Sequence, residues 1–180
     1  MCARNSVGLC ASGVHGTEIR HAPDGACERF ATKRLSESAW YELAQLLERF
    51  PGTHAEDKGV SYAVHYRTDE ATEIALMAAL DAFMRGQDPS GLELVRGRRV
   101  LEIKPAGFDQ GQAIERFMQR PPFLGRIPIL IADEESDESG FRTTLALGGQ
   151  AFSVGQALPG LTGAFPHPSA VRDWLMTLAG

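Results

Sequence analysis

The stretch GRIPILIADEESDESGF, Gly125 to Phe141, decides the fold class of this sequence. Its residues 127–132 are apolar throughout, which is typical of a parallel strand that is covered on both faces. Five acidic side chains then fall within the six positions 133–138, with Ser136 as the only interruption. In open α/β sheets, ligands bind beyond the carboxyl ends of the strands. The acidic cluster therefore follows directly on a place where a ligand is expected.

Patterns typical of strands and helices alternate on both sides of this stretch, which predicts an α/β architecture. The clearest strand is Val60–Arg67. Its alternation puts Tyr62 and Val64 on an apolar face and leaves the face with His65 for function.

The other predicted elements follow from helical spacing, capping residues and turns. They are a first strand near 13–21, a helix around Trp40–Phe50 that ends at Pro51–Gly52, a helix that Thr68 or Asp69 caps and Gly86 ends, a hairpin of strands 92–95 and 99–103 around Gly97, and, after residue 111, a helix, the strand 127–132, a helix over 137–147, a strand over 151–155 and a last helix around Val171–Leu178. The second helix carries Ile74, Met77, Leu80 and Met84 at helical spacing, which predicts its apolar face.

Composition excludes some classes of function. The chain has 180 residues, a net charge of -5 and no block rich in Lys or Arg, so a nucleic-acid partner is not expected. No apolar run approaches the roughly 18 residues that a membrane span requires. We therefore predict a soluble, cytoplasmic protein with neither nucleic-acid nor membrane partners, long enough to bury a core and to be an enzyme.

On the residues alone, two interpretations of the acidic cluster stay open. Acids are common at helix starts because they accept hydrogen bonds from free N–H groups and complement the helix dipole. Alternatively, Asp133 and Asp137 flank one turn at a strand end and suit Mg²⁺, which prefers one or two carboxylates with water and phosphate oxygens.

Four further stretches lie in order before the acidic one: GVHGTEIR (13–20), EDKGVSYAVHYR (56–67), RRVLEIKPAG (98–107) and QRPPFLGR (119–126), and ALGGQAFSVG (146–155) follows it. Together they resemble the trehalose-6-phosphate phosphatases of the haloacid dehalogenase superfamily. The resemblance implies an α/β fold, namely the C-terminal half of a haloacid-dehalogenase-like Rossmannoid core with an inserted α/β cap lobe. The implied domains are a core remnant over 1–20, the cap or substrate lobe over 21–100 and the C-terminal half of the core over 101–180.

The resemblance also implies functional residues. Asp133 would bind Mg²⁺ with Asp137 as its close support, and Glu56, Lys58 and Glu102 would bind the sugar of trehalose 6-phosphate. Carboxylates accept from sugar hydroxyls, while a lysine donates to hydroxyls or pairs with phosphate.

Several of these residues have a simpler interpretation that the residues alone leave open. Glu56 and Lys58 also suit a solvated pair at a strand start. His65 is equally a packed or exposed residue, and His15, in a glycine-rich turn, would stabilise the backbone of that turn. Lys104, next to Pro105, would be a surface charge.

Parts of the family pattern are missing. The family attacks phosphorus with an aspartate and uses a second aspartate two positions later as acid and base, but this sequence contains no Asp-x-Asp. Gln110 stands at the usual lysine position and cannot supply its positive charge. Ala132 and Glu134 replace a glycine and an aspartate of the last motif.

We therefore expect that a complete enzyme has trehalose-6-phosphate phosphatase activity with Mg²⁺. The 180 residues alone are expected to be inactive, as a fragment of such an enzyme would be. The alternative is a non-catalytic descendant that binds a sugar phosphate or a partner protein. A third is a phosphatase for another sugar phosphate. A sheet without its leading strands would expose an edge, which predicts self-association.

Overall fold

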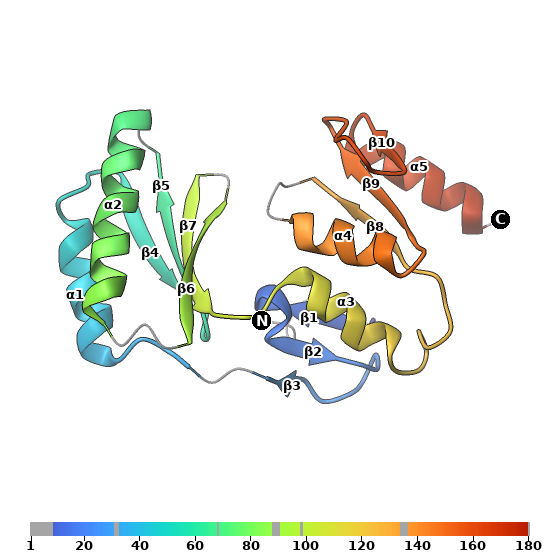
Figure 1. Cartoon of the computed structure of the whole chain (residues 1–180), viewed down its shortest axis with the longest axis horizontal. Helices are drawn as coiled ribbons and strands as arrows, with labels where there is room; N and C mark the ends of the chain where they lie inside the picture. The colour runs from blue at the N-terminus through green and yellow to red at the C-terminus, as the bar shows by residue number, and fades with distance from the viewer. Residues whose placement is uncertain are drawn as a thin grey trace. The chain divides into compact units, whose positions relative to one another are not determined.

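The structure, a computed structural model, describes residues 9–30, 33–67, 69–87, 91–97, 99–133 and 137–179. The chain forms two compact units, residues 1–108 and 109–180 (Figure 1). Each unit mixes helices with a sheet, as the alternating patterns predict. The predicted domain borders at residues 20 and 100 stay predictions. No helix in the described part of the chain combines the length and apolar character of a membrane span.

The first unit begins with a small antiparallel sheet of β1 (Ala11–Gly13), β2 (Glu18–Arg20) and β3 (Glu28–Arg29). The predicted strand near 13–21 is confirmed only in its second half, as β2, because the short helix η1 (Val14–Gly16) occupies the first half. Val14 and His15 have φ angles of 47° and 55°, in the left-handed region, and so turn the chain back on itself.

A second, four-stranded antiparallel sheet, in the order β4-β5-β7-β6, lies in the segment that is predicted to be the cap lobe. Its strands are β4 (Thr53–Asp57), β5 (Tyr62–Tyr66), β6 (Leu92–Gly97) and β7 (Val100–Pro105). The structure confirms the predicted strand around Tyr62 and the predicted hairpin of β6 and β7. The strand β4 was not predicted from the sequence.

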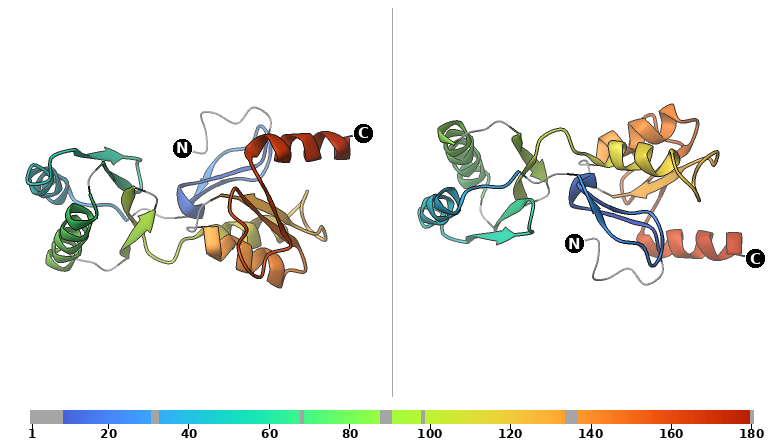
Figure 2. Two further views of the ribbon diagram at one scale, coloured as in Figure 1. Left: turned by 90° about the horizontal axis from the view of Figure 1, so that it is seen from above. Right: turned by 90° about the horizontal axis from the view of Figure 1, so that it is seen from below.

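Two helices cover one face of this sheet, as both views in Figure 2 show. They are α1 (Glu37–Leu47), with Ser36 as N-cap, and α2 (Glu70–Gly86), with Asp69 as N-cap. The structure confirms both predicted helices. The other candidate cap of α2, Thr68, lies outside the described residues.

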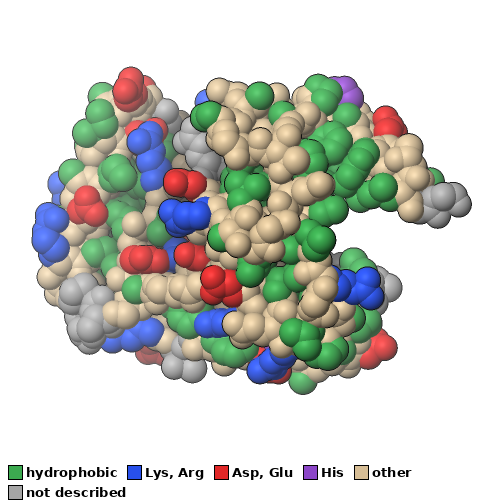
Figure 3. All heavy atoms as spheres, turned by 45° about the vertical axis from the view of Figure 1, so that its right-hand side comes forward, with side chains coloured by type: hydrophobic (Ala, Val, Ile, Leu, Met, Phe, Trp, Pro, Cys, Tyr) green, Lys and Arg blue, Asp and Glu red, His purple; other side chains and the backbone are tan. Residues whose placement is uncertain are grey.

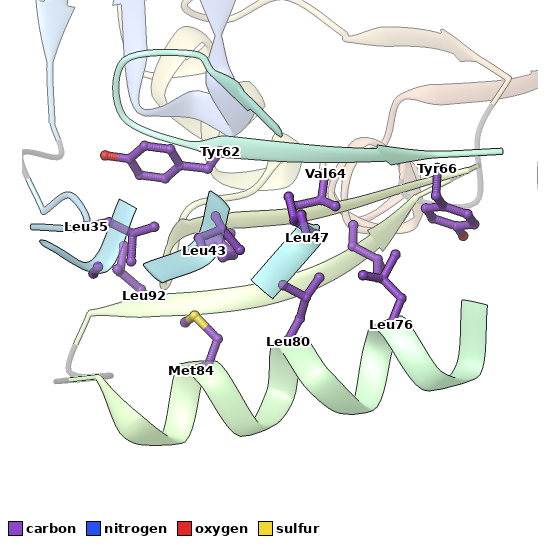
Figure 4. Close-up of a cluster of buried hydrophobic side chains, with 13 residues drawn as sticks. Leu35, Leu43, Leu47, Tyr62, Val64, Tyr66, Leu76, Leu80, Met84 and Leu92 are labelled. Carbon is purple, nitrogen blue, oxygen red and sulfur yellow. The ribbon is translucent and has the colours of Figure 1, made fainter. Parts of the chain in front are cut away.

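The core of the first unit lies between these helices and the sheet (Figure 4). In α2, Leu76, Leu80 and Met84 point toward the strands, where they meet Tyr62, Val64 and Tyr66. The expected apolar face of α2 is therefore partly wrong. Ile74 is 63% exposed, because the row that faces the sheet runs through Leu76 at four-residue spacing.

Within its described residues, 109–133 and 137–179, the second unit has a three-stranded parallel sheet and three helices. They are α3 (Gln110–Met118), β8 (Ile129–Ala132), α4 (Glu138–Ala146), β9 (Gln150–Val154), β10 (Gly163–Phe165) and α5 (Pro168–Ala179). The sheet order is β10-β9-β8, so β8 is an edge strand of the described sheet. The parallel strand is confirmed, but its expected cover on both faces is not, since Ile129 is 50% exposed.

Candidate functional site

A cluster of polar side chains surrounds Glu102 of β7 in the cap lobe. Glu102 is 9% exposed. It accepts hydrogen bonds from Ser61 Oγ, at 2.7 Å, and from His15 Nε2, at 2.9 Å. Lys58 Nζ lies 3.7 Å from the same carboxylate. We call these four residues the Glu102 cluster.

Strand register explains where Glu102 points. Leu101 and Ile103 belong to the core, so Glu102 between them points to the other face of the sheet, away from α1 and α2. We call this the polar face. Ala63 pairs with Glu102 on one side and with Glu56 on the other, so the three side chains stand in a row across three strands.

The connection from β4 to β5 contains two further residues of the cluster, Lys58 and Ser61. The Lys58 N–H donates to the Ser61 carbonyl at 2.9 Å, and Asp57 Oδ1 accepts from the Gly59 N–H at 2.7 Å. Gly59 has a φ of 94°, which a residue with a side chain would adopt only with strain. This tight connection brings Lys58 and Ser61 to the Glu102 carboxylate.

The surroundings of Glu102 keep its carboxyl group ionised. Burial acts to raise its pKa. The hydrogen bonds from His15 and Ser61 and the neighbouring charges outweigh burial, and they lower the pKa of Glu102 to about 2. The cluster therefore presents a fixed carboxylate beside a lysine, which is a combination that can accept from and donate to sugar hydroxyls.

Glu56, the third predicted sugar-binding residue, does not contact the other two. Its carboxylate accepts from His65 Nε2 at 2.9 Å, and its side chain is 51% exposed. The structure therefore brings Lys58 and Glu102 together and places Glu56 on the same face, two strands away from Glu102.

Part of the cluster was not predicted from the sequence. His15 was expected to stabilise the backbone of its own turn, whereas its ring bonds to Glu102, 87 positions away. The expected surface position of Lys104 is wrong. Lys104 is 4% exposed, and its ammonium donates to the Glu93 carboxylate and to the Phe108 carbonyl. One feature of the sequence could have indicated this position for Lys104. Glu102 and Lys104 are two positions apart in one strand, so both lie on the polar face.

The predicted metal residues lie in the second unit. Asp133 follows β8 directly and is exposed, while Asp137 precedes α4 and is 6% exposed. Glu134 lies outside the described residues. The described residues contain no group of three or more potential metal ligands. An accessible carboxylate at a strand end, with a second one at the next helix start, nevertheless fits a hard cation such as Mg²⁺, which takes most of its ligands from water and substrate.

Gln110 is the first residue of α3 and lies close to the start of α4. A Cβ atom added to Gly140 would come within 3.2 Å of Gln110 Oε1, and one added to Gly111 within 2.7 Å of the Ser139 carbonyl oxygen. These two glycines let α3 and α4 approach closely. Gln110 is thereby held beside the helix that follows the acidic motif, where it presents an uncharged amide.

Comparison with known proteins gives a consistent result. Residues 4–156 match the family model described as trehalose-phosphatase. The chain is 34% identical over 173 residues to trehalose-6-phosphate phosphatase of Escherichia coli, which covers 91% of this chain and 61% of that protein. It is also 34% identical to a probable trehalose-phosphate phosphatase of Sinorhizobium fredii, with 93% and 63% covered. The chain thus spans a little over three-fifths of these curated relatives.

Solved structures agree on the fold. The C-terminal domain of trehalose-6-phosphate phosphatase of Candida albicans superposes with a TM-score of 0.74 at 18% identity, covering 92% of this chain and 69% of that one. Sucrose-phosphatase of Synechocystis gives 0.54 at 13% identity, with 92% and 72% covered. These similarities confirm the predicted α/β, haloacid-dehalogenase-like fold class.

Proposed function

The chain belongs to the trehalose-phosphatase family, and on that premise we propose that it acts in the hydrolysis of trehalose 6-phosphate to trehalose and phosphate. Its relatives carry this substrate in their names, and the chain spans about three-fifths of their length. In this proposal the first unit binds the disaccharide and the second unit supplies the acidic motif.

The observation that carries the proposal is the Glu102 cluster. Sugar recognition requires carboxylates and donors that are held in place before the ligand arrives, because each side chain that must be ordered on binding weakens affinity. Glu102 is held by two hydrogen bonds and lies beside Lys58 on a polar face. Glu56 stands in the same row, with only the small Ala63 between the two carboxylates.

On the phosphate side, we propose that Asp133 binds Mg²⁺ and that Asp137 supports it. When bound, the ion would neutralise charge on the phosphate oxygens. Gln110 then contributes a hydrogen-bond donor but no positive charge near this motif. Charge neutralisation by the protein is therefore weaker than a lysine at position 110 would provide.

We further propose that the 180 residues do not release phosphate by themselves. The sequence contains no Asp-x-Asp, so it lacks the paired aspartates that attack phosphorus and transfer the proton in the family chemistry. A non-catalytic role, in which the cap lobe binds a sugar phosphate or a partner protein, is the second candidate. The uncharged amide of Gln110 favours it.

Calorimetry separates these candidates. Trehalose 6-phosphate should bind the chain saturably, and Lys58→Ala should weaken binding about tenfold or more, since a charged hydrogen-bond partner is lost. Lys33→Ala, which removes an exposed lysine elsewhere in the first unit, is the matched control. Absence of any binding heat would contradict sugar-phosphate recognition in either form.

A phosphate-release assay completes the test. With Mg²⁺ and trehalose 6-phosphate, the chain should release no more phosphate than its Asp133→Ala variant. Release that clearly exceeds that of the variant would show that the chain carries its own nucleophile, and the inactive form of the proposal would be abandoned.

We also propose that the second unit self-associates along β8. This strand is at the edge of the described sheet, and Ile127 and Ile129 are 71% and 50% exposed. Hydrophobic side chains gather on the second unit in Figure 3. Sedimentation velocity should show concentration-dependent association that Ile129→Lys removes, because a charge on an edge strand opposes pairing. A strictly monomeric chain at all concentrations would refute it.

A cytoplasmic location and the lack of nucleic-acid partners stay predictions.

A further inference from the structure

The cap lobe contains a second polar feature, at the opposite end of its sheet from Lys58. Here β4 begins, β5 ends and β7 begins, as the pairing of Thr53 with Tyr66 and of His65 with Val100 shows. A hollow of about 890 Å³ opens at this end. It is lined by Gly52, Thr53, His54, His65, Tyr66, Arg67 and Arg99. We call it the arginine hollow.

The lining of the arginine hollow is basic. Among the described residues that form it there are two arginines and two histidines, and no carboxylate. The Arg99 carbonyl accepts from the Tyr66 N–H at 3.2 Å, so Arg67 and Arg99 start from adjacent points of neighbouring strands. Both side chains are exposed.

The two arginines differ from others in the same unit. Arg29, Arg34 and Arg96 each pair with a carboxylate, namely that of Glu18, Asp57 and Glu73 respectively. Within the described part of the chain, neither Arg67 nor Arg99 takes part in an ion pair. Two guanidinium groups that line one hollow repel one another, and an anion bound between them would offset that repulsion.

Backbone geometry at Arg99 adds a second observation. Its φ is 57°, a conformation that residues with a side chain adopt rarely and that glycine adopts freely. Such an outlier costs on the order of 1 kcal/mol or more and persists where the surroundings hold it. The hydrogen bond from Tyr66 is one such restraint.

The histidines present a further set of donors. The rings of His54 and His65 stack with centroids 4.8 Å apart and planes 20° apart. Glu56 accepts from His65 Nε2 and so fixes the orientation of that ring. His54 is exposed and lines the hollow, and within the described residues its ring makes no hydrogen bond.

We propose that the arginine hollow is a binding site for the phosphate group of a small molecule, held between Arg67 and Arg99 with His54 as an additional donor. Planar guanidinium groups bind phosphate oxygens through paired hydrogen bonds, and the absence of a lining carboxylate removes competition for them. This site goes beyond the proposed function, because it lies at the end of the sheet opposite Lys58 and shares no residue with the Glu102 cluster. The phosphate belongs either to free inorganic phosphate or to a sugar phosphate.

Titration of the 180-residue chain with inorganic phosphate tests the site directly. Calorimetry should show saturable binding that Arg67→Gln and Arg99→Gln each weaken about tenfold. Arg85→Gln removes an exposed arginine from the last turn of α2, so it is the matched control, and its phosphate affinity should stay within about twofold of the native value. Equal weakening by all three variants would show a general charge effect and overturn the proposal, as would the lack of saturable binding.

Imidazole NMR signals give a test that does not depend on variants. Inorganic phosphate should shift the signals of His54 and His65 and leave those of His15, in the Glu102 cluster, in place. Trehalose, which has no phosphate, should leave His54 in place. If the site binds a sugar phosphate, trehalose 6-phosphate should also shift the His54 signal. If only inorganic phosphate shifts that signal, the ligand is free phosphate.

The two proposals can fail separately. Loss of sugar binding with phosphate binding intact would refute only the role of Lys58 and Glu102. A response of His15 in place of His54 to inorganic phosphate would place the anion at the Glu102 cluster, and it would overturn the arginine hollow as a site.

Discussion

His15 Nε2 lies 2.9 Å from Glu102 Oε2, so a residue in an N-terminal turn and a residue in a cap strand 87 positions later share one hydrogen bond. The backbone of His15 is in the left-handed region, which costs on the order of 1 kcal/mol for a residue other than glycine. A charge-assisted hydrogen bond contributes a comparable amount. The contact thus helps to hold the turn and, at the same time, orients the carboxylate.

The lowered pKa of Glu102 predicts a dependence of stability on pH. Its folded value is about 2 against a usual 4.5, which corresponds to about 3 kcal/mol of stability above pH 4.5. Because the pKa is lowered by folding, this contribution is lost as pH falls from about 4.5 toward about 2. In urea unfolding, Glu102→Gln should be less stable than the native chain at pH 7, and the difference should shrink across that interval.

Glu48→Gln is the control for this experiment, since Glu48 is exposed at the end of α1. Its stability should follow that of the native chain at every pH. A difference between Glu102→Gln and the native chain that does not change with pH would contradict the assigned charge state.

Ser61→Ala should destabilise the first unit by about 1–3 kcal/mol at pH 7, because a buried carboxylate loses a donor. Ser38→Ala, at an exposed position of α1, should change stability by less than about 0.5 kcal/mol. Urea unfolding measures both. Equal effects of the two substitutions would show that the hydrogen bond from Ser61 to Glu102 adds nothing to stability.

A pair of substitutions in α2 tests the corrected helix face. Leu80→Ala should cost about 2–5 kcal/mol, because Leu80 is fully buried in the core (Figure 4). Ile74→Ala should cost less than about 1 kcal/mol, since Ile74 is 63% exposed. Thermal unfolding followed by circular dichroism would measure both, and the reverse order would show that the helix is rotated about its axis.

Close packing of α3 on α4 predicts that Gly111 tolerates no side chain. A Cβ atom there would lie 2.5 Å from Thr143 Oγ1 and 2.7 Å from the Ser139 carbonyl oxygen. Gly111→Ala should therefore destabilise the second unit by about 1–3 kcal/mol. The fluorescence of Trp174 in a Trp40→Phe background reports on that unit.

Gly86→Ala provides the opposite case. Nothing lies within 4 Å of the added Cβ at the end of α2, so this substitution should be neutral or should stabilise the first unit by up to about 1 kcal/mol. For Gly111→Ala, the contradicting result is an unfolding transition, followed by Trp174 fluorescence, that is the same as without this substitution. It would mean that α3 and α4 are more widely separated than the structure shows.

Much of the fold could be predicted because it is encoded locally. Alternation identified β5, and caps and helical spacing identified α1 and α2. The strand β4 was missed because its sequence, THAED, is polar and poor in strand-forming residues. It becomes a strand because β5 offers it a partner along its whole length.

The sequence by itself determined which residue types stand on the polar face, since every second residue of a strand points the same way. It also carried the order of motifs by which the family is known. Only the tertiary structure decided what each side chain meets there. Glu102 bonds to Ser61 and His15, which are 41 and 87 positions away, and Lys104 is buried beside Glu93. Contacts over such separations depend on how strands pair and turns fold back, which local periodicity does not specify.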